Sequence, residues 1–346
     1  MAAPLRSFAT TALRQAHAGK LVNKSLSAPV AAKAIARPFT ASSSPDRQGP
    51  SATPPASQQA QILLEDPKAG FGFVRHNPLP PKPRRRGVTE IRGPYYSAVG
   101  PRYLADVLEI AGPHIDGLKF AGGSFALLPE APLRQLLDLA HAHGAYVSTG
   151  GWIEHILSSG GTDAVDHYLT RCKALGFDVV ELSAGFISLP PDDWVRLAER
   201  VRAAGLEPKP ELGIQFGAGG DTSAAELRAI GTSDPGRVVD LARRFVRDAG
   251  VERVMIESEG ITENVGDSWR TDVINDILRE LPLENVMFEA ADPAVFNWYI
   301  REFGVDVNLF VDHSQIVQLA GLRAGIWGKS DTFGKITTFR PPDTLS

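Results

Sequence analysis

The sequence predicts a single parallel (β/α)8 barrel, a TIM barrel of the α/β class, over residues 89–323. Short runs of β-branched residues alternate there with longer amphipathic stretches, which is the pattern of βαβ units and a parallel sheet. Eight such pairs occupy a length that is typical of this barrel. No Gly-x-Gly-x-x-Gly motif follows the first run, and its absence disfavours the rival fold, a doubly wound open sheet.

Each expected strand is followed by an expected helix. The strands are Thr89–Arg92, Ile115–Lys119, Ala145–Ser148, Asp178–Glu181, Leu206–Gly213, Arg253–Glu257, Asn285–Glu289 and Val307–Phe310. The helices are 101–111, 131–143, 163–175, 191–204, 235–249, 269–280, 293–303 and 313–322. Four glycines fit the position just after a helix that leads directly into a strand, which supports this order. They are Gly144, Gly176, Gly205 and Gly250.

The residues before the barrel differ from it in composition. Residues 1–45 contain six basic residues, no acidic residue and many Ala, Ser and Thr, which predicts a mitochondrial transit peptide and location in the mitochondrial matrix. No apolar run there is long enough to span a membrane. Residues 46–88 are rich in Pro, Ser and Gln and are expected to form a disordered linker. The basic run Arg84–Arg86 favours a solvated stretch over a docking patch, and residues 324–346 are expected to form an irregular tail.

Charge and cysteine content exclude two classes of function. All 40 acidic residues follow residue 45, whereas six of the 36 basic residues precede it, so the remaining chain is strongly acidic. Because nonspecific nucleic-acid binding needs a basic surface, we expect no nucleic-acid partner. Cys172 is the only cysteine, which excludes an intrachain disulfide and a cysteine-based zinc site. We expect its thiol to be buried and inert.

Polar residues gather where the expected strands end, which is where barrels of this kind carry their functional groups. Lys119 is expected to hold a phosphate or carboxylate, or to act as an acid with a lowered pKa. Several strand-end carboxylates favour a hard divalent ion such as Mg2+, with Glu181 and Glu289 as the preferred ligands. The alternative is that these glutamates pair with Lys or Arg across the barrel. Other strand-end residues are Lys209, Glu211, Glu257 and Glu259.

Small and polar residues in the strand-to-helix turns are the candidates for substrate binding, because glycine lets backbone amides approach a phosphate. Tight turns explain the glycines equally well. His313 is a candidate proton carrier, although Asp312 favours an N-terminal helix cap at this point. The candidates are Gly122, Gly123, Ser124, Gly150, Gly151, Ser183, Asn308 and His313.

Five segments at the strand ends carry a family resemblance. They are Asp116–Ser124, Tyr146–Glu154, Gly176–Gly185, Val286–Ala290 and Val307–His313. These segments resemble the phosphosulfolactate synthase family, including its eukaryotic branch related to a plant heat-stress-associated protein. The resemblance implies a TIM barrel and a lyase that adds sulfite to phosphoenolpyruvate, a small anionic substrate, with Mg2+. It further implies that Lys119 binds the substrate, that Glu181 and Glu289 hold the metal, and that Glu211 is an acid or base.

The fifth strand departs from that family. Glu211-Leu-Gly213 is followed by Ile214 and Gln215 rather than by lysines, so a cation expected near sulfite is missing. Lys209 points to the same face as Glu211 and is expected to substitute in part. Two alternatives therefore remain, a non-catalytic stress-protective or binding protein, and an enzyme acting on another phosphorylated or carboxylated molecule. The sequence leaves a homo-oligomer possible, since it contains no pattern that indicates an interface.

Overall fold

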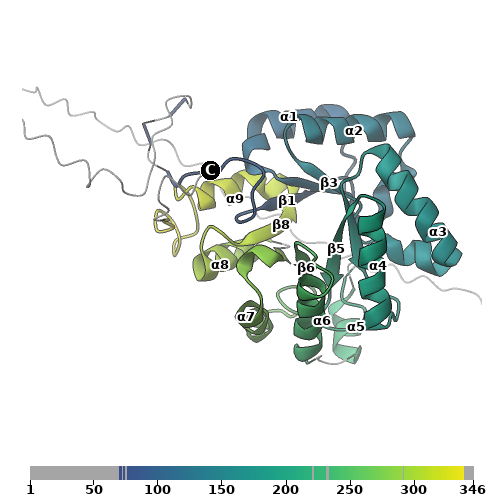
Figure 1. Ribbon diagram of the computed structural model, residues 1–346. Coiled ribbons are helices and arrows are strands. Elements are labelled where there is room, and N and C mark those ends of the chain that lie inside the picture. The colour runs from purple at the N-terminus through teal and green to yellow at the C-terminus, as the bar shows by residue number, and fades with distance from the viewer. Residues whose placement is uncertain are drawn as a thin grey trace, which may run out of the picture. The chain divides into compact units, whose positions relative to one another are not determined.

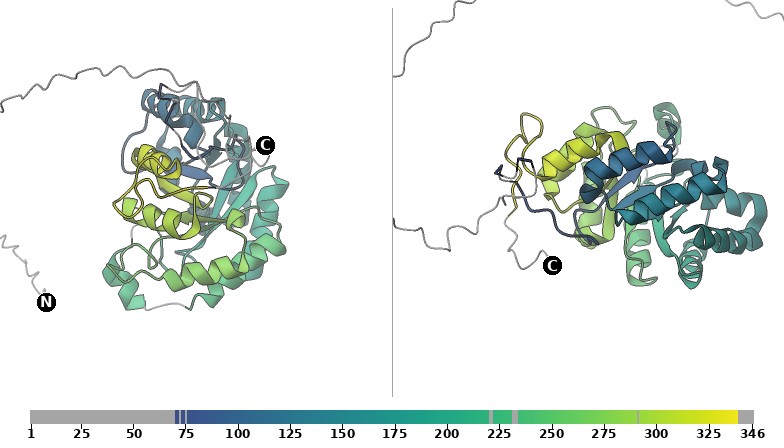
Figure 2. Two further views of the ribbon diagram at one scale, coloured as in Figure 1. Left: turned by 90° about the vertical axis from the view of Figure 1, so that its left-hand side faces the viewer. Right: turned by 90° about the horizontal axis from the view of Figure 1, so that it is seen from above.

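The barrel is closed and entirely parallel. The computed structural model describes residues 70–338 except 72, 75, 220, 221, 231–233 and 291, so the predicted transit peptide lies outside the described residues. Eight strands pair in sequence order, and the first strand also pairs with the last. Helices are arranged around the strands (Figures 1 and 2). The predicted (β/α)8 barrel is confirmed.

The strands are β1 Thr89–Arg92, β2 Gly117–Lys119, β3 Tyr146–Ser148, β4 Val179–Ser183, β5 Glu207–Leu212, β6 Val254–Ile256, β7 Val286–Glu289 and β8 Asn308–Asp312. The α-helices are α1 Pro101–Ala111, α2 Glu130–Ala142, α3 Ile153–Leu175, α4 Pro191–Ala203, α5 Ala224–Ile230, α6 Gly236–Arg247, α7 Thr271–Glu280, α8 Pro293–Phe303 and α9 Ile316–Arg323. Short 3-10 helices are η2 Gly112–His114, η3 Ala121–Leu127, η4 Leu283–Asn285 and η5 His313–Gln315.

Two α-helical segments among the described residues were not expected from the sequence. Helix α3 begins at Ile153 rather than near residue 163, and Gly161 interrupts it with a left-handed φ of 66°. The glycine pair at this interruption favours a turn, which hid the first part of the helix from the periodicity. Helix α5 is an extra short helix between β5 and α6. Neither segment changes the order of the barrel.

The barrel separates two hydrophobic cores of unequal size. The large core lies between the strands and the helices and includes Cys172, whose predicted burial is confirmed. The small core contains only Val88, Met255, Met287 and Phe310, with Tyr146 packed against it. The barrel also buries several charged side chains, and some of these belong to the functional site.

Strand β5 contains two prolines that shorten its pairing with β6. The Glu207 amide donates to the Asp178 carbonyl on the β4 side, so Pro208 and Pro210 face β6 by alternation. A proline has no N–H to give to a neighbouring strand. The ladder to β4 accordingly spans five residue pairs, whereas the ladder to β6 has two. The loops that follow β4 and β5 border the functional site.

The chain before β1 is part of the folded domain from Asn77 onward. The Asn77 amide donates to the carbonyls of Arg323 and Ile336 at 2.9 and 3.0 Å. Arg84 pairs with Asp116 at 2.9 Å, and both side chains are buried. The prediction that Arg84 is solvated is therefore wrong, because its partner precedes the second strand and is far away in sequence. Among the residues that the structure describes, no helix is long and apolar enough to cross a membrane.

Candidate active site

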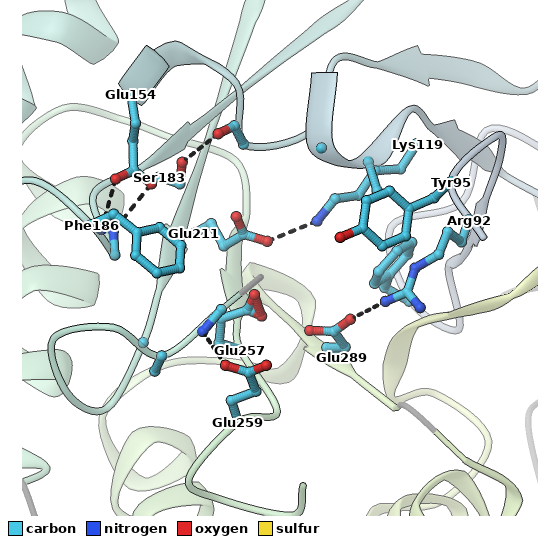
Figure 3. Close-up of a pocket in the computed structure, with 18 of the residues that line it drawn as sticks. Arg92, Tyr95, Lys119, Glu154, Ser183, Phe186, Glu211, Glu257, Glu259 and Glu289 are labelled. Carbon is cyan, nitrogen blue, oxygen red and sulfur yellow. Dashed lines mark hydrogen bonds and ion pairs between the residues drawn. The ribbon is translucent and has the colours of Figure 1, made fainter. Parts of the chain in front are cut away.

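A polar pocket of about 430 Å³ opens at the carboxyl ends of the strands. Figure 3 shows Arg92 and Lys119 entering it from one side and Glu154 and Phe186 lying on the opposite side. Its volume is in the range of small-molecule sites. The pocket lies where TIM-barrel enzymes carry their chemistry.

Two cations form the β1–β2 side of the pocket. Arg92 and Lys119 are register partners at the ends of neighbouring strands. Arg92 pairs with Glu289 at 2.6 Å, and its guanidinium lies 4.9 Å from the Tyr96 ring centroid. The Phe310 ring of the small core is close to both cations, at 5.1 Å from Arg92 and 4.5 Å from Lys119. These contacts hold both positive charges toward the pocket.

A chain of buried ion pairs continues from Lys119 down the barrel axis. The Lys119 ammonium lies 2.7 Å from a carboxylate oxygen of Glu211 and 2.7 Å from one of Glu181. The second oxygen of Glu181 is 3.1 Å from Lys209, which is also 2.6 Å from Glu90. Glu181, Lys209 and Glu90 are buried and do not line the pocket.

This chain changes the expected roles of Glu181 and Lys209. Each oxygen of Glu181 already faces a lysine, so the residue is not available as a metal ligand in this arrangement. Lys209 pairs with two glutamates below the pocket, so it does not replace a cation at the mouth. Glu181 is therefore paired with lysines across the barrel, which was the alternative to its role as a metal ligand. Strand alternation correctly predicted the face of these residues but not their depth.

The pKa values of Lys119 and Glu211 are both raised, which keeps the lysine charged and the glutamate neutral. Burial alone would lower the pKa of Lys119, but Glu181 and Glu211 raise it well above its ordinary value, so the amine stays charged. An acid role that depends on a lowered Lys119 pKa is therefore excluded. Burial, together with the negative charge of Glu181, raises the pKa of Glu211 to about 8. Glu211 consequently holds a proton at neutral pH.

Glu211 has one oxygen on Lys119 and the other near the turn after β3. A Cβ built on Gly151 would lie only 2.8 Å from the second oxygen and 2.7 Å from the Ser183 hydroxyl. Ser183 in turn donates to the Gly151 carbonyl at 2.9 Å. The absence of a side chain at Gly151 thus leaves Glu211 room beside the pocket, and all three residues line it.

Glutamates after β6 and at the end of β7 make a further part of the pocket wall acidic, and Glu289 of this group is the partner of Arg92. Glu257 and Glu289 are hydrogen-bonded to each other, and burial followed by the charge of Glu289 raises the pKa of Glu257 well above its ordinary value. Glu259 accepts a hydrogen bond from the Gly219 amide at 2.6 Å, and burial raises its pKa to about 7. No three acidic, histidine or cysteine side chains among the described residues are grouped so as to hold a metal ion.

Glu154 at the start of α3 fixes the loop after β4. Its carboxylate accepts hydrogen bonds from the amides of Gly185 and Phe186, at 3.2 and 2.8 Å. This places the half-exposed Phe186 ring at the rim of the pocket. Sequence reasoning missed the roles of Glu154 and Arg92. Alternation along β1 offered a signal for Arg92, since it lies two residues after the inward-facing Glu90.

Comparison with known proteins decides the family. A family model of (2R)-phospho-3-sulfolactate synthase matches residues 77–329. The chain belongs to this family. It is 38% identical over 268 residues to the Arabidopsis thaliana protein HEAT-STRESS-ASSOCIATED 32, covering 74% of this chain and 92% of the relative. It is 26% identical over 261 residues to the phosphosulfolactate synthase of Methanothermobacter thermautotrophicus, covering 74% and 94%. The corresponding enzyme of Methanocaldococcus jannaschii is 24% identical over 283 residues, covering 80% and 98%.

Not all the expected substrate-binding residues of this phosphosulfolactate synthase family member lie in the pocket. Gly122, Gly151 and Ser183 line it, whereas Gly123, Gly150 and Ser124 do not. Gly150 and Gly123 are needed for close packing instead. A Cβ at Gly150 would lie 2.4 Å from the Phe120 carbonyl oxygen, and one at Gly123 would lie 2.3 Å from the Trp152 ring. For these two glycines the tight-turn explanation holds.

Asn308 and His313 have structural partners outside the pocket. The Asn308 side chain accepts from the Val88 amide and donates to the Val286 carbonyl, at the amino-terminal end of the barrel. It is therefore out of reach of a ligand in the pocket. A ring nitrogen of His313 lies 3.0 Å from the Arg92 carbonyl, and the predicted cap by Asp312 is confirmed by its bond from the Ser314 amide.

Proposed function

We propose that the chain catalyses the Mg2+-dependent addition of sulfite to phosphoenolpyruvate, giving (2R)-3-phosphosulfolactate. The division of charge in the pocket carries the proposal. Arg92 and Lys119 on the β1–β2 side suit the carboxylate and phosphate of the acceptor, and the carboxylates of β6 and β7 suit a divalent cation. Membership of the family and similarity to two phosphosulfolactate synthases support the same reaction.

The chemistry requires one new bond to sulfur and one proton. The sulfur lone pair attacks the methylene carbon, and the electrons of the carbon–carbon double bond move into the carboxylate to give an enediolate. The permanently charged Lys119 and Arg92 stabilise this negative charge. Glu211, which is protonated at neutral pH and borders the pocket, then donates its proton to the carbon that carries the phosphate. Atoms and electrons balance without a redox partner.

The carboxylates of Glu257 and Glu289 fit a Mg2+ ion. Two carboxylates that hydrogen-bond to each other need a proton or a cation between them, and both offer the oxygen ligands that Mg2+ prefers. One or two protein carboxylates are sufficient, because Mg2+ usually completes its shell with water and substrate oxygens. When bound, the ion would supply further positive charge for the enediolate. Glu289 is therefore the proposed ligand on the condition that Arg92, its ion-pair partner at 2.6 Å, turns to the substrate, and Glu257 takes the place of Glu181.

The direct test is to incubate the purified chain with phosphoenolpyruvate, sulfite and Mg2+ and to follow the product by phosphorus NMR. We expect Lys119→Ala to abolish turnover and Lys335→Ala, an exposed lysine, to leave it unchanged. Since Lys119 also holds the buried chain of ion pairs, Arg92→Gln serves as a second variant, and each variant must show a cooperative melting transition. Lack of turnover in the unaltered chain, with no thermal shift from any reactant, would contradict the proposal.

A non-catalytic protective role is the second candidate, and similarity to a protein named for heat-stress association favours it. It predicts that the chain, including its inactive Lys119→Ala variant, suppresses aggregation of a heated client protein. Loss of suppression in that variant would tie any protective effect to the site. We also propose import into the mitochondrial matrix. A fusion of residues 1–45 to a reporter that stays in the cytosol would overturn this localisation.

A further inference from the structure

A small side chamber of about 120 Å³ adjoins the main pocket. Gly185, Ile187, Glu211 and Gly213 line both spaces and so form the border that the two share. The chamber extends between the loops that follow β4 and β5 toward the start of α6. Arg92 and Lys119 do not line the chamber, but Glu211, which does, lies 2.7 Å from Lys119 in the main pocket (Figure 3).

The chamber has one cation and one acid among its described lining residues, Arg237 and Glu211. Arg237 makes no ion pair or hydrogen bond with any part of the chain that the structure describes. The Gln215 amide, by contrast, already donates to the Leu227 carbonyl at 3.2 Å and holds α5. Among the described lining residues, the exposed Arg237 is therefore the one cationic donor without a partner on the described chain, and the Ser188 hydroxyl is a second, neutral donor.

We propose that this side chamber binds the attacking nucleophile, a small oxyanion with the size and charge of sulfite, and that Arg237 is its binding residue. Its volume is that of about four water molecules, which matches an anion of four heavy atoms. Because Glu211 is protonated at neutral pH, the one acid among the chamber's described lining residues does not repel an anion. The identity of the nucleophile rests on the proposed function.

This placement separates the two anionic reactants. Arg92 and Lys119 hold the acceptor on the β1–β2 side, while the nucleophile approaches from the loops after β4 and β5. Its sulfur lone pair forms the carbon–sulfur bond, the double-bond electrons move away from it into the carboxylate, and Glu211, which lines both spaces, delivers the proton. The two anions then do not compete for one pair of cations. Arg237 also provides the positive charge that the lysine-free loop after Glu211 lacks.

The kinetic test compares Arg237→Gln with Arg102→Gln, an exposed arginine of α1 that serves as the matched control. We expect Arg237→Gln to raise the KM for sulfite about tenfold or more, the effect of losing one charge-assisted hydrogen bond. The KM for phosphoenolpyruvate should change less than twofold, and the control should change neither. An unchanged KM for sulfite, or equal increases for both reactants, would overturn the assignment.

Binding can be measured without turnover because Trp194 lines the chamber. We expect sulfite to cause a saturable change in tryptophan fluorescence that Trp194→Phe and Arg237→Gln each remove and Arg102→Gln retains. Arg237-dependent binding without any turnover would reject the synthase reaction and retain the chamber as an oxyanion site. Turnover with an Arg237-independent KM for sulfite would reject the chamber and retain the reaction. A fluorescence change that Arg237→Gln leaves intact would overturn the proposed binding residue.

Discussion

The Glu211→Gln variant should become increasingly more stable than the unaltered chain as the pH rises. In the folded chain Glu211 keeps its proton up to a pKa of about 8, whereas an unfolded glutamate loses it near 4.5. Between these values the folded state binds more protons than the unfolded state, so the free energy of unfolding falls as the pH increases. Gln cannot ionise, and it still offers an oxygen to Lys119.

The size of the effect follows from the two pKa values. One pKa step corresponds to about 1.4 kcal/mol, so ionisation of Glu211 lowers the free energy of unfolding by up to about 5 kcal/mol at pH above 8. Roughly half of this loss falls between pH 6 and pH 9. Because about 1 kcal/mol shifts the melting temperature of a domain this size by about 2 to 4 °C, Glu211→Gln should gain roughly 5 to 10 °C over that interval.

The assay is thermal melting of both proteins from pH 5 to pH 9 in a chelator, so that no divalent ion changes the charge of the neighbouring carboxylates. Because the charge of Glu211 also raises the pKa of Glu257, both proteins carry Glu257→Gln in this comparison, which removes that contribution. Asp193→Asn, at an exposed carboxylate of α4, provides the control, and its difference from the unaltered chain should not vary with pH. A Glu211→Gln difference that is constant with pH would show that Glu211 is ionised throughout.

Two further predictions concern the packing beneath and beside the pocket. Asp116→Ala should lower the free energy of unfolding by about 3 to 5 kcal/mol in denaturant titrations, since it leaves the buried Arg84 without its partner, whereas Arg85→Ala at an exposed position should cost less than about 0.5 kcal/mol. Glu154→Ala should speed amide hydrogen exchange at Gly185 and Phe186 about tenfold or more, and unchanged exchange would show that this carboxylate does not hold the loop.

The fold could be predicted from the sequence because local signals carry it. Alternating short and long periods and glycines after helices are visible within a few residues, and they gave the strand order correctly. Arg84 could not be placed in this way. Its burial depends on Asp116, and nothing near Arg84 in the sequence indicates that contact. Likewise, the chain from Asn77 has a loop-like composition but packs against α9 and the tail through hydrogen bonds.

The site was predictable in part for the same reason. Strand ends and alternation correctly brought Lys119, Glu211 and Glu289 to one pocket. Depth was misjudged, because β4 continues two residues past Glu181 to Ser183, and Lys209, its register partner, lies two residues before Glu211 on β5, so both lie below the mouth. The contributions of Glu154 and Arg237 come from helix starts, which the strand-end rule does not cover.

The buried ion pairs give Lys119 and Glu181 a structural role in addition to any catalytic role. Lys119 and Glu181 fill space that hydrocarbon side chains occupy in many barrels. Removing either residue would leave the charge of the other buried without its partner. A family member without any catalytic activity would therefore still be expected to carry this lysine and this glutamate. Their presence says little about whether a given relative is an enzyme. Arg237 makes no hydrogen bond or ion pair with a described residue, so it is the better marker of chemistry when related chains are compared.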